Sequence, residues 1–150
     1  METKFNSQIC TTREQSERLL ALGLKKETAD VTIHHEYGIT TIFGIDYSKY
    51  VNLHKEQGYT EEFFKNVFPA WSLHRMLSML PILIDCKKEL QSYSNQLYLD
   101  LYVNCISYMY TDYDYDDRIY ISWGNDLFNA IVDAIEWLIK EGYFNKEYLV

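Results

Sequence analysis

The sequence predicts an α+β fold, in which an antiparallel sheet of about three to five strands is packed on one face by two or three helices, including a long C-terminal helix. Three observations predict it: a capped amphipathic segment at 125–141, a strictly alternating segment at 97–103, and capping boxes near residue 11. The length of 150 residues and an apolar content of 47% favour one domain over residues 1–150, with a core that needs no disulfide or metal.

The segment 125–141 reads NDLFNAIVDAIEWLIKE and is the most distinct helix in the sequence. Asn125 is the expected N-cap, Asp126 complements the helix dipole, and Gly142 is the expected C-cap. At about 100° per residue, its large apolar side chains share one broad face. They are Leu127, Phe128, Ile131, Val132, Ile135, Leu138 and Ile139.

The N-terminal half contains weaker patterns. The overlapping boxes Thr11 to Glu14 and Thr12 to Gln15 predict a helix to about Leu22. Two β-branched segments, 31–33 and 39–43, predict short strands. The segment 47–57 is expected to be a short strand or an irregular loop.

The middle of the chain is expected to be helical between two prolines. Thr60 opens a short helical turn, and Pro69 suits the entry to a helix that Pro81 ends. The segment 83–90 is ambiguous between strand and loop.

The last third predicts strands followed by the long helix. Residues 97–103 alternate between aliphatic and polar or aromatic side chains, as a half-buried strand does. The alternation changes phase near Asn104, which predicts a turn or bulge. Residues 118–123 form a further strand, and the aromatic tail at 143–150 is expected to fold back.

The net charge of −8 is unevenly placed along the chain. Residues 1–84 carry 9 Lys/Arg and 10 Asp/Glu, a net charge of −1, whereas residues 85–150 carry 5 and 12, a net charge of −7. The acidic half would repel a phosphate backbone, which argues against direct binding of nucleic acid. It suits a basic protein partner, a mimic of DNA, or solubility alone.

The cysteines favour a cytoplasmic protein with free thiols, because Cys10, Cys86 and Cys105 are odd in number and far apart. The sequence predicts no signal peptide and no membrane span. No spacing of ligands predicts a metal or another cofactor.

The sharpest local feature is an acidic and aromatic segment, which is the candidate binding surface if the protein is a binding protein. Its residues are Asp112, Tyr113, Asp114, Tyr115, Asp116 and Asp117. Alternating aspartates resemble the opening of a calcium loop, but the turn-glycine position holds Asp117 and the bidentate-glutamate position holds Trp123. The favoured interpretation is a solvated hairpin tip, followed by a recognition loop for a basic partner.

Other reactive residues give weak patterns. His34 and His35 are adjacent on a predicted strand, so they point to opposite faces and cannot easily share a metal ion. Cys86 stands beside two lysines, which would lower the pKa of an exposed thiol, but no histidine spacing supplies its base. A small Cys/His-dependent enzyme is therefore an alternative only, and the sequence favours a non-catalytic protein.

Three blocks together resemble a group of small uncharacterised proteins of gut Bacteroidetes and of the phages and mobile elements that infect them. The blocks begin at Thr11-Thr12-Arg13-Glu14-Gln15-Ser16, at Pro69-Ala70-Trp71-Ser72-Leu73, and at Asp126-Leu127-Phe128-Asn129-Ala130. The resemblance implies an intracellular accessory protein, with a phage as its expected carrier.

These observations predict a non-catalytic binding protein that modulates a host factor through a protein or small-ligand surface. The alternatives are an acidic DNA mimic that inhibits a nucleic-acid-binding protein, and the Cys/His enzyme. Self-association is a further option, because aromatic residues are frequent, with 14 tyrosines in the chain.

Overall fold

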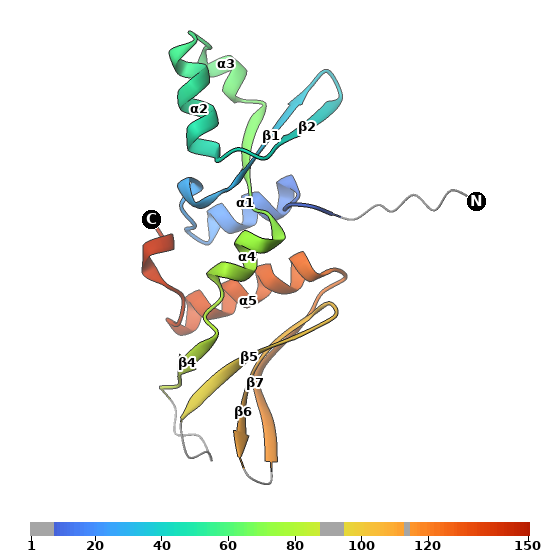
Figure 1. Cartoon of the computed structure of the whole chain (residues 1–150), viewed down its shortest axis with the longest axis vertical. Coiled ribbons are helices and arrows are strands. Elements are labelled where there is room, and N and C mark those ends of the chain that lie inside the picture. Colours follow the sequence, from blue (N-terminus) through green and yellow to red (C-terminus); the bar gives the residue numbers. More distant parts are fainter. Residues whose placement is uncertain (1–7, 88–94, 113–114) are drawn as a thin grey trace, which may run out of the picture. The chain divides into compact units, whose positions relative to one another are not determined.

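The chain divides into two compact units, Met1–Arg75 and Met76–Val150, each with its own antiparallel sheet (Figure 1). The computed structural model describes residues 8–87, 95–112 and 115–150, without the side chains of residues 111, 112 and 115–117. The predicted α+β class is confirmed, with the strands divided between a three-stranded and a four-stranded sheet. That residues 1–150 form one domain stays a prediction.

The sheet of the first unit has the strand order β2-β1-β3. Strands β1 (Val31–Glu36) and β2 (Ile39–Phe43) confirm the two predicted strands, and β1 extends beyond the prediction. A two-residue turn joins them, with Tyr37 at φ 49° and Gly38 at φ 75°. Positive φ at both turn residues is the type I′ geometry, whose twist matches that of the paired strands.

Helix α1 (Arg13–Ala21) begins with one of the two predicted capping boxes. The Thr12 hydroxyl accepts from the Gln15 backbone N–H, and the Gln15 side chain accepts from the Thr12 N–H. The other box does not form, because the Thr11 hydroxyl accepts from the backbone N–H of Trp71 instead. The expected short helix is therefore confirmed, and the turn η1 (Lys26–Thr28) follows it.

The prediction of a strand or loop at 47–57 is wrong, because α2 (Tyr47–Glu56) is a helix. Tyr50 and His54, four residues apart, stack with ring centroids at 4.1 Å. Such i,i+4 contacts are typical of a helix, but the polar residues between them hide the period in the sequence. The short helix α3 (Glu61–Phe64) follows, as the predicted turn at residue 60 indicates.

Pro69 does not open a helix, because it lies in strand β3 (Val67–Ala70), opposite Thr32 of β1. An edge strand tolerates proline, since one side of it needs no ladder donor. The helix α4 (Leu73–Met79) begins only afterwards. Its first turn is capped by Ser72, whose hydroxyl accepts from the Arg75 backbone N–H at 3.1 Å.

The sheet of the second unit has the order β4-β5-β6-β7. Its strands are β4 (Leu83–Asp85), β5 (Gln96–Tyr102), β6 (Cys105–Asp112) and β7 (Tyr115–Trp123). The predicted turn near Asn104 is confirmed, because Tyr102 and Cys105 pair directly across it. A register shift between Tyr108 and Met109 marks a bulge against β7.

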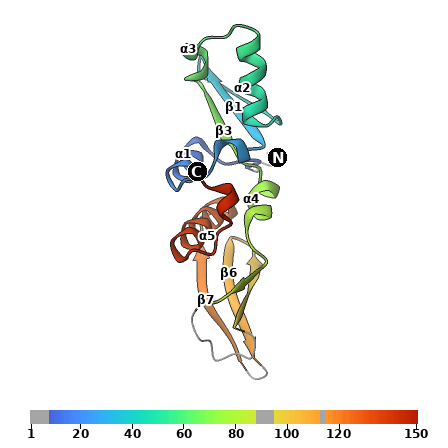
Figure 2. The same cartoon turned by 90° about the vertical axis from the view of Figure 1, so that its left-hand side faces the viewer.

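Helix α5 (Leu127–Glu141) packs on β6 and β7 and confirms the long C-terminal helix (Figures 1 and 2). Its N-cap is Asp126 and not Asn125, because the Asp126 carboxylate accepts from the Asn129 backbone N–H at 2.8 Å. Gly142 ends the helix in the left-handed conformation, as predicted. Trp137 stacks on Tyr120 of β7 at 4.4 Å, so this face of the sheet is covered.

Tyr108 is fully buried on the covered face, and its hydroxyl donates to the carbonyl of Pro81 at 2.9 Å. Burial raises the pKa of Tyr108 far above its usual value. The folded unit thus holds this proton more tightly than the unfolded chain. The protonated Tyr108 therefore contributes to the free energy of unfolding. This contribution is fully present below about pH 10 and is lost as the pH rises toward the pKa of Tyr108 in the folded unit.

We therefore expect Tyr108 to contribute about 1.4 kcal/mol per pH unit to the fall in the free energy of unfolding above pH 10. Urea titrations at several alkaline pH values measure this slope. Tyr108→Phe should lower stability at neutral pH, because the Pro81 carbonyl loses its donor, but should flatten the alkaline slope. An unchanged slope in Tyr108→Phe would contradict the assignment.

Candidate functional site

The strongest candidate surface is the face of the second sheet that lies opposite α5. Direct pairing places Leu83 beside Tyr98, Tyr102 beside Cys105, and Cys105 beside Trp123, so these side chains share one face. We call the large exposed residues of this face the aromatic face. They are Leu83, Tyr98, Tyr102, Ile121 and Trp123.

The exposure of the aromatic face is high for residues of this size. Tyr102 is 69% exposed and Trp123 is 68% exposed, whereas Tyr108 on the opposite face is 0% exposed. Clustered exposed aromatic residues are a common feature of protein-binding surfaces, because each buries a large area with little loss of side-chain freedom.

Tyr102, Cys105 and Trp123 form a row across three neighbouring strands. Tyr102 and Trp123 therefore lie two strand spacings apart, about 10 Å. Between them the small Cys105 side chain is only 4% exposed. Neighbouring side chains therefore cover Cys105, and the two large exposed side chains on either side of it form the surface that a partner would contact.

The centre of this face is polar. Arg118 lies 3.7 Å from the carboxylate of Asp100, and the hydroxyl of Ser107 donates to the same carboxylate at 3.3 Å. Burial raises the pKa of the Cys105 thiol, and the nearby Arg118 offsets this only in part. A thiol held in its protonated form is a poor nucleophile, so this face is better suited to binding than to covalent chemistry.

The predicted acidic binding segment falls at the far end of the same β6–β7 hairpin. Asp112 ends β6 and pairs with Tyr115, which begins β7. Tyr113 and Asp114, and the side chains of Asp112, Tyr115, Asp116 and Asp117, lie outside the described residues. Seven residue steps separate Cys105 from Asp112, so the backbone of Asp112 is about 23 Å along the strand from the aromatic row.

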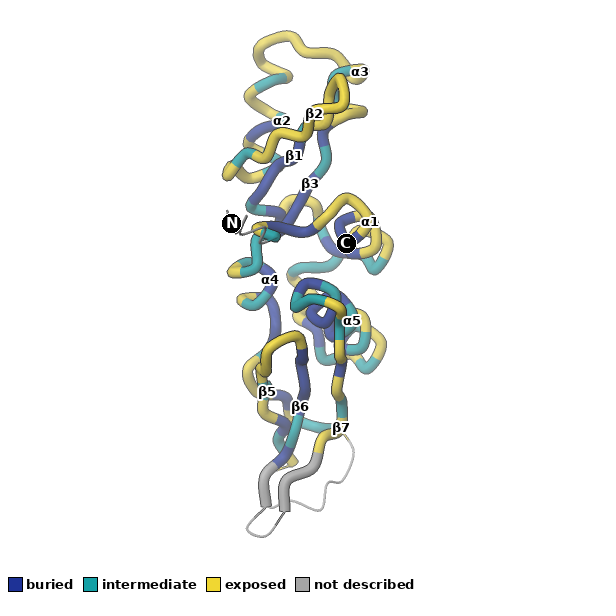
Figure 3. The backbone as a smooth tube through the Cα atoms, turned by 90° about the vertical axis from the view of Figure 1, so that its right-hand side faces the viewer, coloured by how far each residue is buried: buried dark blue, intermediate teal, exposed yellow. Residues whose placement is uncertain are grey.

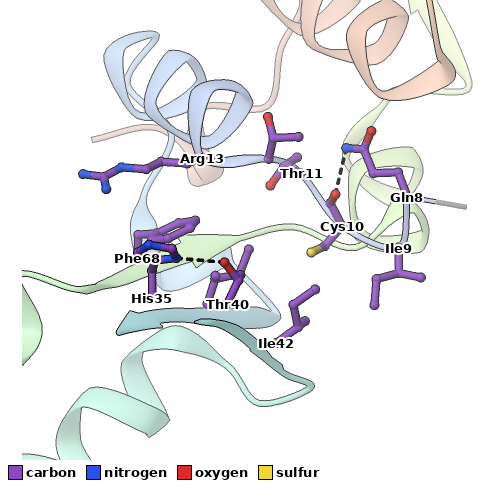
Figure 4. A pocket seen from close by; sticks show the side chains of 11 residues that line it. Gln8, Ile9, Cys10, Thr11, Arg13, His35, Thr40, Ile42 and Phe68 are labelled. Atoms are coloured by element: carbon purple, nitrogen blue, oxygen red, sulfur yellow. Dashed lines mark hydrogen bonds between the residues drawn. The ribbon is translucent and has the colours of Figure 1, made fainter. Parts of the chain in front are cut away.

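A second concave surface lies in the first unit, where a groove of about 470 Å³ runs between residues 8–13 and the sheet (Figure 4). Its apolar lining is Ile9, Cys10, Ile33, Ile42 and Phe68. Arg13 lies over the Phe68 ring at 5.6 Å and pairs with Glu17 at 2.8 Å. The volume is within the range of small-ligand sites. That the protein binds a small ligand stays a prediction, and this groove is the candidate site for it.

The two adjacent histidines point to opposite faces of β1, as expected. His34 contacts the Phe63 ring at 4.8 Å on the side of α3, whereas His35 lines the groove and bonds Thr40 through Nδ1 at 2.8 Å. Within the described ranges, no three His, Cys, Asp or Glu side chains come close enough together to hold a metal ion.

Cys86 is half-buried, and its sulfur lies 3.7 Å from the hydroxyl of Tyr143. All four histidines precede residue 76, so none belongs to the unit that holds Cys86. The described contacts of Cys86 therefore supply no base, and the Cys/His enzyme stays an untested alternative.

Several carboxylates of the second unit are engaged in the fold itself. Asp126 caps α5, Asp133 accepts from the Ser122 hydroxyl at 3.4 Å, and Asp100 faces Arg118. A DNA mimic needs carboxylates that are presented in a row toward solvent. These three are used locally, so they do not favour that alternative.

No protein-family model, no curated protein and no solved structure matches the chain. The resemblance to proteins of gut Bacteroidetes and their phages stays a prediction. None of the described helices has the length and apolar character needed to cross a bilayer.

The row of Tyr102, Cys105 and Trp123 was not predicted from the sequence. Tyr98 and Tyr102 alternate with aliphatic residues in 97–103, which shows that they share a face. The contribution of Trp123 depends on its pairing with Cys105, and such pairing is set by the turn and the bulge. The signal in the sequence was the pair Tyr98 and Tyr102, four positions apart and therefore on the same face of a strand.

Proposed function

We propose that the protein is a non-catalytic binding protein that captures a basic protein through the aromatic face. The observation that carries the proposal is the gathering of five large, exposed apolar side chains on one face of a sheet whose other face is covered by α5 at β6 and β7. Patches of this kind on a stable sheet are characteristic of protein interfaces.

The charge of the second unit supports a basic partner. Residues 76–150 carry 5 Lys/Arg and 12 Asp/Glu, a net charge of −7. Such a field attracts a cationic protein and speeds its association. A lysine or arginine of that partner can lie over the exposed ring of Tyr102 or Trp123, because the face of an aromatic ring favours a cation.

The proposal includes an accessory role in the cytoplasm, directed at a host factor. It is supported by the three free cysteines, Cys10, Cys86 and Cys105, which suit a reducing compartment. The acidic segment at 112–117 acts here as an electrostatic guide, while the aromatic row supplies most of the contact energy.

We expect Trp123→Ser to weaken partner binding by about 30-fold or more, because a central aromatic residue of an interface contributes about 2 kcal/mol or more. The full chain is first immobilised on a resin, and the partner is captured on it from a lysate of the host. It is then purified, and its Kd is measured by calorimetry. The matched control is Tyr37→Ser, which removes a 92% exposed aromatic residue of the first unit.

Charge reversal at Asp112, Asp114 and Asp116 should slow association and reduce its salt dependence. Equal affinity of the wild type and Trp123→Ser for the purified partner would refute the aromatic face as the binding surface. An acidic partner, or one whose binding does not change with salt, would refute the basic chemistry.

A further inference from the structure

The two sheets present four edges, and three of them carry features that prevent another strand from pairing. Strand β3 contains Pro69, β4 has only three residues, and β7 has a bulge and the charged run Asp116-Asp117-Arg118. Strand β2 reads Ile-Thr-Thr-Ile-Phe, without charge, proline or bulge. Natural edge strands are usually protected by such features, so the edge of β2 is exceptional in this chain.

The type I′ turn determines which backbone groups of β2 face outward. In a two-residue hairpin the residues flanking the turn, Glu36 and Ile39, form a hydrogen-bonded pair, and the pairs then alternate along the ladder. Thr41 therefore bonds to β1, whereas Thr40 and Ile42 turn their N–H and C=O groups to the outer edge. The opposite strand agrees, because the N–H of His35, which pairs with Thr40, donates to Asn66 on the other side of β1.

The side chains of β2 are open as well. Ile39 is 67% exposed and Ile42 is 44% exposed, and Figure 3 shows β2 as exposed along most of its length. Ile42 also lines the apolar groove, beside Ile33 of β1 (Figure 4). No other strand of the described chain pairs with this edge.

Charge indicates which part of the protein can meet a second copy. Residues 1–75 carry 9 Lys/Arg and 10 Asp/Glu, a net charge of −1, whereas the second unit carries −7. Two copies that approach through their first units meet little repulsion, whereas two second units repel one another.

We propose that the protein forms a symmetric dimer by antiparallel pairing of β2 with β2 of a second copy. A two-fold axis through Thr41 sets Thr40 opposite the partner's Ile42, and Ile42 opposite the partner's Thr40. Both positions turn their backbone groups outward, so each pair exchanges two N–H···O bonds. The result joins two three-stranded sheets into one continuous sheet.

The second copy fits this edge because β2 is its own complement. An uncharged, extended and β-branched strand is favoured as the partner of such an edge, and β2 has this composition. A closed two-fold contact also uses the same surface on both subunits, which removes the exposed edge from both at once. The dimer would carry two aromatic faces, although the pairing does not depend on what those faces bind.

The first test is the mass of the full chain in solution by light scattering and native mass spectrometry over a concentration series. The expected result is twice the 17.9 kDa chain mass at high concentration. Thr40→Pro removes an outward N–H and should give the mass of a single chain. The matched control Thr40→Val loses the same hydroxyl but keeps the N–H, so it should remain dimeric.

Circular dichroism checks that Thr40→Pro is folded. If that variant fails to fold, Ile42→Lys serves in its place, with Leu53→Lys as its control on the 48% exposed side chain of α2. A wild-type chain that stays monomeric at the highest concentration overturns the proposal. So does a folded Thr40→Pro or Ile42→Lys dimer.

Amide hydrogen exchange tests the register. The amides of Thr40 and Ile42 should become protected as concentration rises, whereas that of Thr41 is bonded to β1 and should be equally protected at all concentrations. If the chain is a dimer but the exchange rates of the Thr40 and Ile42 amides do not change with concentration, the dimer has another interface. The proposed pairing would then be wrong.

Discussion

Replacing Trp71 by alanine is expected to lower the free energy of unfolding of the first unit by about 3–5 kcal/mol. Trp71 is 0% exposed, and its indole N–H donates to the Thr28 hydroxyl at 2.9 Å. The substitution would leave a large cavity and a buried hydroxyl without its donor. Both effects have the same sign, and together they are comparable to the total stability of a small unit.

Hydrogen exchange of the β1 amides measures this loss within the first unit, and urea titration followed by circular dichroism measures it for the chain. Trp71→Phe should recover much of the loss, because it refills most of the cavity and lacks only the indole N–H. The matched control is Trp123→Ala, which removes an exposed tryptophan and should change stability by less than about 0.5 kcal/mol. Equal losses for the two alanine variants would show that Trp71 does not support the unit.

The sequence predicted the elements in which local and tertiary preferences agree. In α5 the apolar period, a cap at each end and the charges all indicate one helix, and only the N-cap was placed one residue early. The same agreement holds for β5, where strict alternation matches a half-buried strand.

The errors occur where two signals conflict. Proline is common both at helix starts and in edge strands, so Pro69 fits either. Only the pairing of β3 with β1 decides between them. In α2 two of the residues at helical spacing are Tyr50 and His54, whose rings stack on one another. Histidine counts as polar in a hydrophobicity pattern, although its ring packs here as an apolar side chain does. A search for apolar residues at helical spacing therefore misses this helix.

The candidate site was predictable only in part. The sequence predicted a binding surface in what proved to be the β6–β7 hairpin. It also predicted a basic partner, because the acidic residues are concentrated in the second half of the chain. It could not bring Tyr102 and Trp123 to the two sides of Cys105, because that row depends on two strand registers. A shift of one residue in either register would turn one of the aromatic residues to the other face.

Replacing Ile135 by alanine is expected to destabilise the second unit by about 2–5 kcal/mol, because the substitution removes three buried carbons from the centre of the face of α5. Ile135 is 0% exposed, as are its neighbours one turn away, Ile131 and Leu138. The loss should be close to the upper end if these neighbours cannot close the cavity. Ile135→Val, which removes one methyl group, should cost about 1 kcal/mol.

Urea titration monitored by circular dichroism gives both values, and Lys140→Ala on the exposed side of the same helix is the control, with an expected cost below about 1 kcal/mol. The partner-binding assay adds a second readout. The α5 side chains that contact the sheet are Trp137 and Asp133, whereas Ile135 lies on the other side of the helix, so Ile135→Val should bind the partner with wild-type affinity at temperatures where the unit is folded. A weakened Kd in folded Ile135→Val would mean that the aromatic face depends on fine packing against α5, and that the binding surface is not set by strand register alone.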